Sequence, residues 1–527
     1  MRRLSILAAI IFLAAVDLFS EELGCYYFKK KYQPEPRPVF EASKDQLPVP
    51  VLDENKEWLK MYWKAWEIAF RGIRQPQEGS PLVSNWLDEA FSEQIFQWDT
   101  IFMMMFARYG HHVFPAIQSL DNFYARQRKS GYIGREYNEI SGQLVHFDFD
   151  GGLFSEKGYK NTINPPLFAW AEMETFKLTG DSTRLRNVLP VLEKYAEWLQ
   201  QPGTPTAKDW EKNGRRSINS LHNLFWNTPL GSGMDNTPRP QEEGFGWVEM
   251  SSQMVIMYNN LAEMCHFLQE FEKEKRYQEI SCQISAAINQ WCWNDEIGFY
   301  FDVKANGEQF LKKTSGGFWP LLAGICDEKQ AEKLISHLKN PREFWRPVVF
   351  PTLAADEEEY KPDGGYWLGG VWAPTNVMII KGLENYHDQE FAAAATEKYL
   401  EAIFEVFEKT GTLWENYSPE KYEPGNPAKP DFVGWTGCGP IQLLIENVIG
   451  IKMNCIDRQI TWDLYRADRH GVQNFFMGKN KISLICEAGI HQRKIRVESE
   501  VEFELIIRNS ERSNSYGIKK GKNDLEF

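Results

Sequence analysis

The chain has 527 residues, enough for one large domain with an appendage or for two to three ordinary domains. Asp and Glu outnumber Lys and Arg by 73 to 59, which gives a formal net charge of −14 and an isoelectric point near 5.4. Such an acidic chain offers no basic face to the phosphates of a nucleic acid, so that class of partner is excluded.

The first twenty residues have the pattern of a signal peptide. Arg2 and Arg3 precede an apolar stretch over residues 4–16 that is too short to span a bilayer comfortably, and residues 18–20 form a plausible cleavage zone. We expect residues 1–20 to direct the protein to the periplasm or out of the cell, rather than to make it an integral membrane protein. Cys25 leaves lipidation open as an alternative, although Glu22 stands where a lipoprotein site requires an apolar residue.

Most of the remaining chain shows helical periodicity. Apolar residues recur at intervals of three and four over 188–199 and 254–268, as expected for helices that pack one stripe inward. Similar patterns predict helices over residues 57–72, 95–109, 113–127, 167–178, 274–293, 329–338, 373–385 and 391–409. The fold class is therefore mainly α.

The pattern of apolar and polar residues changes near residue 454. Residues 481–486 and 494–505 alternate apolar with polar side chains, which is typical of half-buried strands. We expect a small β-rich region over 454–527, with a frayed tail from Arg508 onward, and a hairpin within a loop around 298–303. The eight cysteines contain no Cys-x-x-Cys, so most are interpreted as buried apolar residues, with one or two disulfides possible.

Two carboxylates lie in segments rich in Gly, Pro, Asn and aromatic residues. Asp235 occurs in Gly-Ser-Gly-Met-Asp-Asn-Thr-Pro-Arg and Glu415 in Leu-Trp-Glu-Asn-Tyr-Ser-Pro-Glu. Cleavage of a glycosidic bond requires one carboxylic acid to protonate the leaving oxygen and a second, ionised carboxylate to activate water or to attack the sugar. Taken alone, Asp235 could equally form an Asx-turn and Glu415 could be an exposed loop carboxylate.

Five ordered segments resemble glycoside hydrolase family 63 and the related trehalase family. They are Gln-Trp-Asp-Thr at 97–100, Asn-Pro-Pro at 164–166, the Asp235 segment at 231–239, Gly-Tyr-Trp-Leu-Gly-Gly-Val-Trp-Ala-Pro-Thr-Asn at 365–376, and Trp-Glu-Asn-Tyr at 414–417. The resemblance spans roughly residues 57–451. It implies an (α/α)6 barrel over residues 21–453 and an inverting α-glycosidase, with Asp235 as general acid and Glu415 as general base. It also implies sugar-binding roles for Trp98, Asp99, Asn164, Trp367, Trp372 and Asn376.

The chain departs from the family pattern at two positions. Many members have Tyr-Trp-Arg-Gly-Pro where this chain has Tyr-Trp-Leu-Gly-Gly, so Leu368 replaces an arginine and Gly370 a proline. The Asp235 segment is more similar to mannosylglycerate hydrolases and bacterial α-glucosidases than to trehalases. We therefore expect an α-glucoside or α-mannoside as substrate and rank trehalose below them.

Other chemistries find less support in the sequence. There is no His-Glu-x-x-His, no zinc-type Cys/His spacing and no Walker loop, so neither a metal nor a cofactor is expected. Asp148 and Asp150 could contact calcium, but a turn with solvated acids is the better interpretation. A sugar isomerase would need histidine bases, which the five segments lack. A non-catalytic carbohydrate-binding protein remains an alternative, and in either case the expected partner is a saccharide.

Overall fold

The computed structural model describes residues 22–27, 30–89, 93–145, 163–200, 218–219, 223–227, 229–239, 246–304, 306–489 and 493–527. The predicted signal peptide and the 148–152 segment lie outside these residues. Within the described residues, no helix has the length and apolar character needed to cross a membrane.

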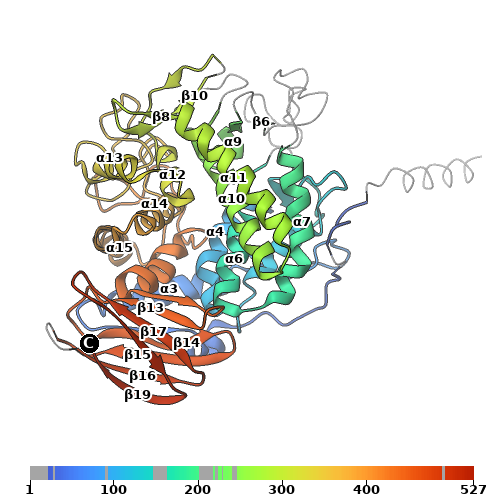
Figure 1. Cartoon of the computed structure of the whole chain (residues 1–527). Helices are drawn as coiled ribbons and strands as arrows, with labels where there is room; N and C mark the ends of the chain where they lie inside the picture. Colours follow the sequence, from blue (N-terminus) through green and yellow to red (C-terminus); the bar gives the residue numbers. More distant parts are fainter. Residues whose placement is uncertain are drawn as a thin grey trace, which may run out of the picture.

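The helices differ in how much of their surface they bury. Every residue of α4 (Gln97–Ala107) and of the π-helix η6 (Gly439–Ile449) is buried, and α6 (Phe168–Thr179), α10 (Val248–Phe267) and α14 (Ala373–Asn385) are buried nearly all round. In contrast, α3 (Trp58–Arg71), α7 (Ser182–Gln200), α11 (Phe271–Trp291), α13 (Glu328–Lys339) and α15 (Gln389–Thr410) bury a single stripe. The molecule therefore has central helices covered by amphipathic ones (Figure 1).

Short helical segments connect these long helices. They are α2 (Phe40–Ser43), η1 (Lys44–Gln46), η2 (Arg108–Gly110), η3 (Ile117–Leu120), α5 (Asp121–Tyr124), α9 (Pro229–Ser232), η4 (Ser315–Phe318), α12 (Trp319–Ala323) and η5 (Thr436–Cys438). The prediction of one continuous helix over 113–127 is wrong, because only η3 and α5 form there. Pro115 has no N–H to donate, and Ala116 has a non-helical backbone (φ −79°, ψ −105°), so the chain turns before the helix restarts.

Two sheets lie in the C-terminal part of the fold, and the first also includes one strand from near the N-terminus (Figure 1). The first has the order β1-β14-β15-β16-β19, all antiparallel, and joins Val49–Leu52, His470–Met477, Asn480–Cys486, Lys494–Ser499 and Gly521–Glu526. The second has the order β12-β13-β17-β18 and joins Ile451–Asn454, Gln459–Asp463, Phe503–Arg508 and Ser513–Ile518, with β13 and β17 parallel.

The C-terminal tail is not frayed, which corrects the sequence prediction. Beyond Arg508, β18 pairs with β17 and β19 pairs with β16. Both segments are rich in polar residues, and β18 is largely exposed, so their hydrophobicity gives little sign of a strand. Main-chain hydrogen bonds to neighbouring strands order them instead.

Short two-stranded sheets lie within the helical part; in one of them, α4 to α5 separate the paired strands, so it is not a hairpin. They pair β2 (Ile73–Arg74) with β3 (Trp86–Leu87), β4 (Gln94–Phe96) with β5 (Glu136–Asn138), β6 (Ile218–Asn219) with β7 (Phe225–Trp226), β8 (Trp293–Asn294) with β9 (Phe299–Tyr300), and β10 (Asp302–Val303) with β11 (Gln309–Phe310). The hairpin predicted around 298–303 is thus present. All eight cysteines are free thiols, and five of them are buried. No disulfide forms among them.

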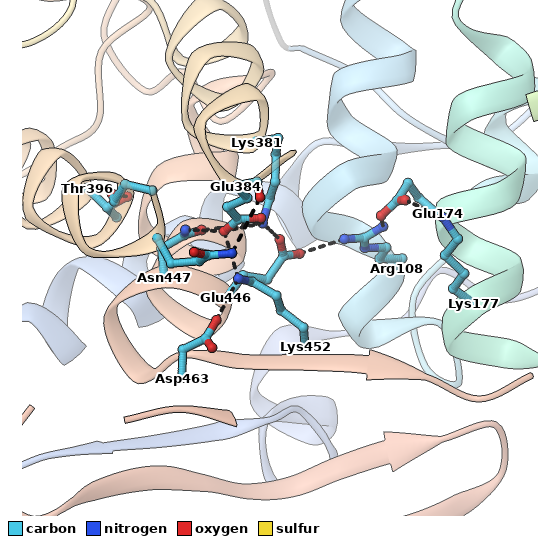
Figure 2. Close-up of polar contacts among 12 residues, drawn as sticks. Arg108, Glu174, Lys177, Lys381, Glu384, Thr396, Glu446, Asn447, Lys452 and Asp463 are labelled. Atoms are coloured by element: carbon cyan, nitrogen blue, oxygen red, sulfur yellow. Dashed lines mark hydrogen bonds and ion pairs between the residues drawn. The ribbon is translucent and has the colours of Figure 1, made fainter. Parts of the chain in front are cut away.

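A chain of ion pairs connects the helices to the second sheet (Figure 2). Arg108, just after α4, contacts Glu174 of α6 at 2.5 Å and Glu446 of η6 at 2.6 Å. Lys381 of α14 pairs with Glu446, and Lys452 of β12 lies 2.9 Å from both Glu384 and Asp463. We call these residues, Arg108, Glu174, Lys381, Glu384, Glu446, Lys452 and Asp463, the ion-pair chain. It lies at the C-terminal end of α4 and in the C-terminal halves of α6 and α14.

Candidate active site

The predicted site residues lie near the starts of the central helices, at the ends opposite to the ion-pair chain. Trp98 and Asp99 occupy the first turn of α4, and Trp372 immediately precedes α14. Asn164 precedes α6 by a few residues, and Pro165 and Pro166 follow it in a segment without regular structure. Asp235 follows α9, and Glu415 lies in the connection from α15 to η5.

The backbone of a neighbouring strand-like segment holds Glu415 in place. Its N–H donates to the Lys429 carbonyl at 2.9 Å, and its carboxylate Oε2 accepts from the Lys429 N–H at 3.2 Å. The Trp435 indole Nε1 donates to the Glu415 carbonyl at 2.9 Å. Burial raises the pKa of the Glu415 carboxyl to about 7, since the charge and N–H of Lys429 offset only part of the desolvation.

Asp235 is a partly exposed residue, whereas Glu415 is buried. Burial nevertheless raises the pKa of its carboxyl to about 6; the Arg135 guanidinium lowers this pKa and the Glu136 carboxylate raises it. The charge of Asp235 in turn raises the pKa of Glu415, so the two carboxyls interact across the site. Both groups can therefore exchange protons near neutral pH.

Asp99 and Tyr366 join these two carboxyls. The Asp99 carboxyl is almost fully buried, and burial raises its pKa well above the usual range, with the charges of Glu415 and Asp235 adding to the shift. Burial also raises the pKa of the Tyr366 hydroxyl, as do the charges of Asp235, Glu415 and Asp99 in that order. The Tyr366 side chain in turn lowers the pKa of the Glu415 carboxyl and so favours its ionised form. Tyr366 thus lies among all three carboxyls.

Tryptophan side chains pack next to Tyr366 and the Asp235 segment. We call Asp99, Arg135, Asp235, Asn236, Tyr366 and Glu415 the cluster. The rings of Trp367 and Trp372 stack with centroids 4.0 Å apart and planes 6° apart, and both side chains are almost completely buried. Trp98 packs against the backbone at Gly233, where a built Cβ would lie 3.1 Å from the indole. Gly233 has φ +77°, which also favours glycine there. The glycine therefore brings the Asp235 segment against α4.

Asn164 and Asn376 bind backbone groups in this structure. Asn164 Oδ1 accepts from the Trp98 N–H at 3.4 Å, and its Nδ2 donates to the Gly231 carbonyl at 3.3 Å. Asn376 accepts from the Phe350 N–H at 2.8 Å and donates to the Trp372 carbonyl at 2.9 Å. These contacts explain why asparagine is present at both positions, and the sugar-binding roles of the two residues stay predictions.

Three residues of the cluster were assigned no role from the sequence. Arg135 is about a hundred positions from Asp235, so no local pattern links the two. Asn236 and Tyr366 fall inside recognised segments, but the sequence does not predict which groups their side chains contact. The Asn236 side chain donates to the Gly365 carbonyl at 3.0 Å and accepts from the Trp367 N–H at 2.9 Å. It thereby ties the Asp235 segment to the Trp367 segment.

The departure at Gly370 has a clear structural reason. The Gly370 N–H donates to the Gly364 carbonyl at 2.8 Å, a bond that the family's usual proline could not make. A Cβ at this position would lie 2.2 Å from the Tyr366 carbonyl oxygen. Leu368 is partly exposed, and its carbonyl accepts from the Lys361 N–H at 2.8 Å. Nothing in these contacts explains why leucine replaces arginine there.

Metal ligands do not gather in the part of the chain that the structure describes. Within these residues, no group of three or more His, Cys, Asp or Glu side chains could hold a metal ion. The segment with Asp148 and Asp150 lies outside them.

Relatives with known sequences share much of this chain. It is 26% identical over 467 residues to an uncharacterised protein of Borreliella burgdorferi, covering 86% of this chain and 91% of the relative. It is also 21% identical over 285 residues to the mannosyl-oligosaccharide glucosidase of Saccharomyces cerevisiae, which covers 49% of this chain but only 32% of that enzyme.

Solved structures share its fold. The family 63 mannosylglycerate hydrolase of Thermus thermophilus, in complex with glucose, superposes with a TM-score of 0.54 at 19% identity, over 72% of this chain and 98% of that one. The neutral trehalase Nth1 of Saccharomyces cerevisiae superposes with a TM-score of 0.51 at 14% identity, over 68% and 73%. The fold is that of the six-hairpin glycosidases.

The family model for the mannosylglycerate hydrolase MGH1-like glycoside hydrolase domain matches residues 94–436. This range includes Asp99, Asp235, Tyr366 and Glu415, whose side chains interact in the structure. The chain therefore belongs to the MGH1-like family of glycoside hydrolases.

Proposed function

We propose that this protein hydrolyses an α-glucosidic or α-mannosidic bond of a small saccharide with inversion at the anomeric carbon. The observation that carries the proposal is the pair of interacting carboxyls on two separate loops, whose pKa values of about 6 and about 7 leave one proton on the pair near about pH 6.5. Because Glu415 has the higher pKa, that proton resides mainly on Glu415 in the resting pair, and the assignment of Asp235 as acid and Glu415 as base follows the family resemblance rather than these values. An inverting glycosidase needs such a pair, one member protonated and the other ionised.

In the proposed reaction Glu415 accepts a proton from a water molecule, and the water oxygen attacks the anomeric carbon. Asp235 donates its proton to the glycosidic oxygen as the bond between that oxygen and the anomeric carbon breaks. The products are a sugar of inverted configuration and a free alcohol. Asp235 then holds the negative charge and Glu415 the proton, and exchange with solvent restores the starting state. The partly exposed position of Asp235 suits this exchange.

Two finer features belong to the same proposal. We infer that the central and covering helices close into an (α/α)6 barrel, with the site at one rim. We also infer that residues 1–20 direct export, so that the enzyme acts in the periplasm or outside the cell. The trehalase-type activity ranks second, because the Asp235 segment is less similar to that of trehalases and the solved trehalase shares only the fold.

The test is hydrolysis of a panel of α-linked disaccharides, trehalose, and α-glucosyl and α-mannosyl glycerates, with the product anomers followed by proton NMR. Initial release of the β-anomer from an α-substrate is the expected result. Asp235→Asn and Glu415→Gln should each lose roughly 10²–10⁴-fold in kcat while keeping the wild-type melting temperature to within a few degrees.

Glu358→Gln provides the matched control, since Glu358 is an exposed loop carboxylate that forms no ion pair among the described residues. It should retain the wild-type rate. Initial release of the α-anomer would exclude inversion, and near-normal turnover by Glu415→Gln would remove this residue as the base. Sugar binding without any turnover across the panel would favour a non-catalytic carbohydrate-binding protein.

A further inference from the structure

The segment that carries Tyr366 has an unusual backbone. Gly364, Gly365 and Tyr366 have φ values of +105°, +49° and +67°, so three successive residues adopt positive φ. Glycine tolerates this region, but a tyrosine in it is uncommon and needs support from its surroundings. The Tyr366 ring contacts both stacked tryptophans, with centroids 5.0 Å from Trp372 and 6.2 Å from Trp367.

Side chains from two sides hold this backbone. The Trp372 indole Nε1 donates to the Tyr366 carbonyl at 3.1 Å. Asn236 binds the groups on either side of Tyr366, since it donates to the Gly365 carbonyl at 3.0 Å and accepts from the Trp367 N–H at 2.9 Å. One amide group therefore spans the residue with the uncommon backbone, and that amide belongs to the neighbour of Asp235.

The position of Asn236 makes it a link between the two halves of the proposed reaction. Asp235, the proposed acid, directly precedes it in the chain. Tyr366, which it brackets, interacts electrostatically with both Asp235 and the proposed base Glu415. The Asn236 side chain itself is exposed, so its two hydrogen bonds contribute little to the stability of the whole fold. Their effect is local to this segment.

We propose that Asn236 is a positioning residue that couples the proposed acid to the proposed base. It does so through hydrogen bonds to the backbone on both sides of Tyr366. The inference rests on the proposed function for its kinetic consequence. Asn236 does not touch the reacting atoms in this assignment, and it acts through the placement of the Tyr366 hydroxyl. Two consequences follow, one for turnover and one for the titration of Glu415.

The first experiment is a double-mutant cycle with Asn236→Ala, Tyr366→Phe and the double variant. Asn236→Ala should reduce kcat by about 10–100-fold, because a displacement of about 1 Å costs that much. Since Asn236 acts through Tyr366, adding Asn236→Ala to Tyr366→Phe should reduce kcat by less than about threefold more. Fully additive losses would overturn the proposal.

The second measurement follows the pH dependence. The Tyr366 side chain lowers the pKa of Glu415, so its displacement in Asn236→Ala should move the centre of the pH profile of kcat/KM upward by a few tenths of a pH unit. Tyr366→Phe should produce a shift in the same direction. An unchanged profile in Asn236→Ala would contradict the coupling.

A matched control and a readout without substrate complete the test. Asn509 also binds backbone with its side chain, accepting from the N–H groups of Glu511 and Arg512 at 3.0 and 2.9 Å, but lies in the turn between β17 and β18. Asn509→Ala should leave kcat and the pH profile unchanged. Carbodiimide labelling of Glu415 from about pH 5 to 8, read by peptide mass spectrometry, reports its titration even if no substrate is turned over. A labelling curve unmoved by Asn236→Ala would overturn the inference independently of the proposed function.

Discussion

The protons on Asp235 and Glu415 determine the pH at which the pair can work. With pKa values of about 6 and about 7, both carboxyls are protonated below this range and no base is available. Above it both are ionised, and no acid is available. We expect kcat/KM to follow a bell-shaped profile centred near about pH 6.5, with the limits belonging to the pair rather than to either residue. A flat profile between about pH 5 and 8 would exclude this pair.

The sequence could predict the two candidate carboxylates but not their surroundings. Asp235 and Glu415 are recognisable because each lies in a distinctive segment. The contacts of Arg135, Asn236 and Tyr366 depend on which loops meet in space, and a hydrogen bond from a side chain to backbone leaves no trace in spacing. Resemblance also assigns sugar contacts to Asn164 and Asn376, whereas the structure adds that both amides bind backbone.

At the scale of elements, the turn over residues 364–370 depends on glycine at its end. Gly370→Ala would place a Cβ 2.2 Å from the Tyr366 carbonyl oxygen and 2.8 Å from Trp372 Nε1, which are hydrogen-bonded to each other. We expect a loss of about 1–3 kcal/mol of stability and at least a tenfold fall in kcat. Denaturant unfolding and steady-state kinetics measure both.

Gly517→Ala serves as the control for this substitution, because a Cβ at Gly517 meets no heavy atom within 4 Å. It should change neither stability nor turnover appreciably. Wild-type behaviour in Gly370→Ala would show that the turn can relax around a side chain.

The elements that the sequence predicted are those with strong local signals. The helix predicted over 373–385 matches α14, and those over 167–178 and 329–338 match α6 and α13 to within one residue at each end. The failures arose where local pattern and tertiary context disagree. Pro115 interrupts an otherwise helical pattern, and β18 and β19 gain order from strands elsewhere in the chain. Neither effect is visible in hydrophobic periodicity.

At the scale of the whole molecule, the ion-pair chain joins helices α4, α6, α14 and η6 to the second sheet (Figure 2). Glu446 is its central member, because it accepts from both Arg108 and Lys381 while almost fully buried. Glu446→Gln would leave two buried cations undercompensated. We expect a loss of about 3–5 kcal/mol in the free energy of unfolding near pH 7, measured by urea denaturation.

The stability lost in Glu446→Gln should depend on pH in a specific way. Although burial opposes ionisation, Lys381 and Arg108 lower the pKa of Glu446 to about 2, below its usual value of 4.5. Its contribution is therefore complete above about pH 4.5 and is lost as the pH falls toward about 2, so the difference between wild type and Glu446→Gln should shrink across that window. The control is Glu57→Gln, which removes an exposed pair with Lys60 and should leave the midpoint nearly unchanged. Equal effects of the two variants would contradict the assigned role of the ion-pair chain.

Strand β1 can pair in the first sheet only after almost the whole chain has been synthesised. It pairs along its whole length with β14, with Val49 opposite Gln473, so the partners are separated by about 420 residues of chain. At ribosomal rates of roughly 5–20 residues per second, β1 waits on the order of 20–80 s before its partner exists. During that interval its hydrogen-bonding groups have no native partner strand and are open to other chains. The time between emergence and pairing, rather than the final stability, is then the period in which the nascent protein depends most on protection.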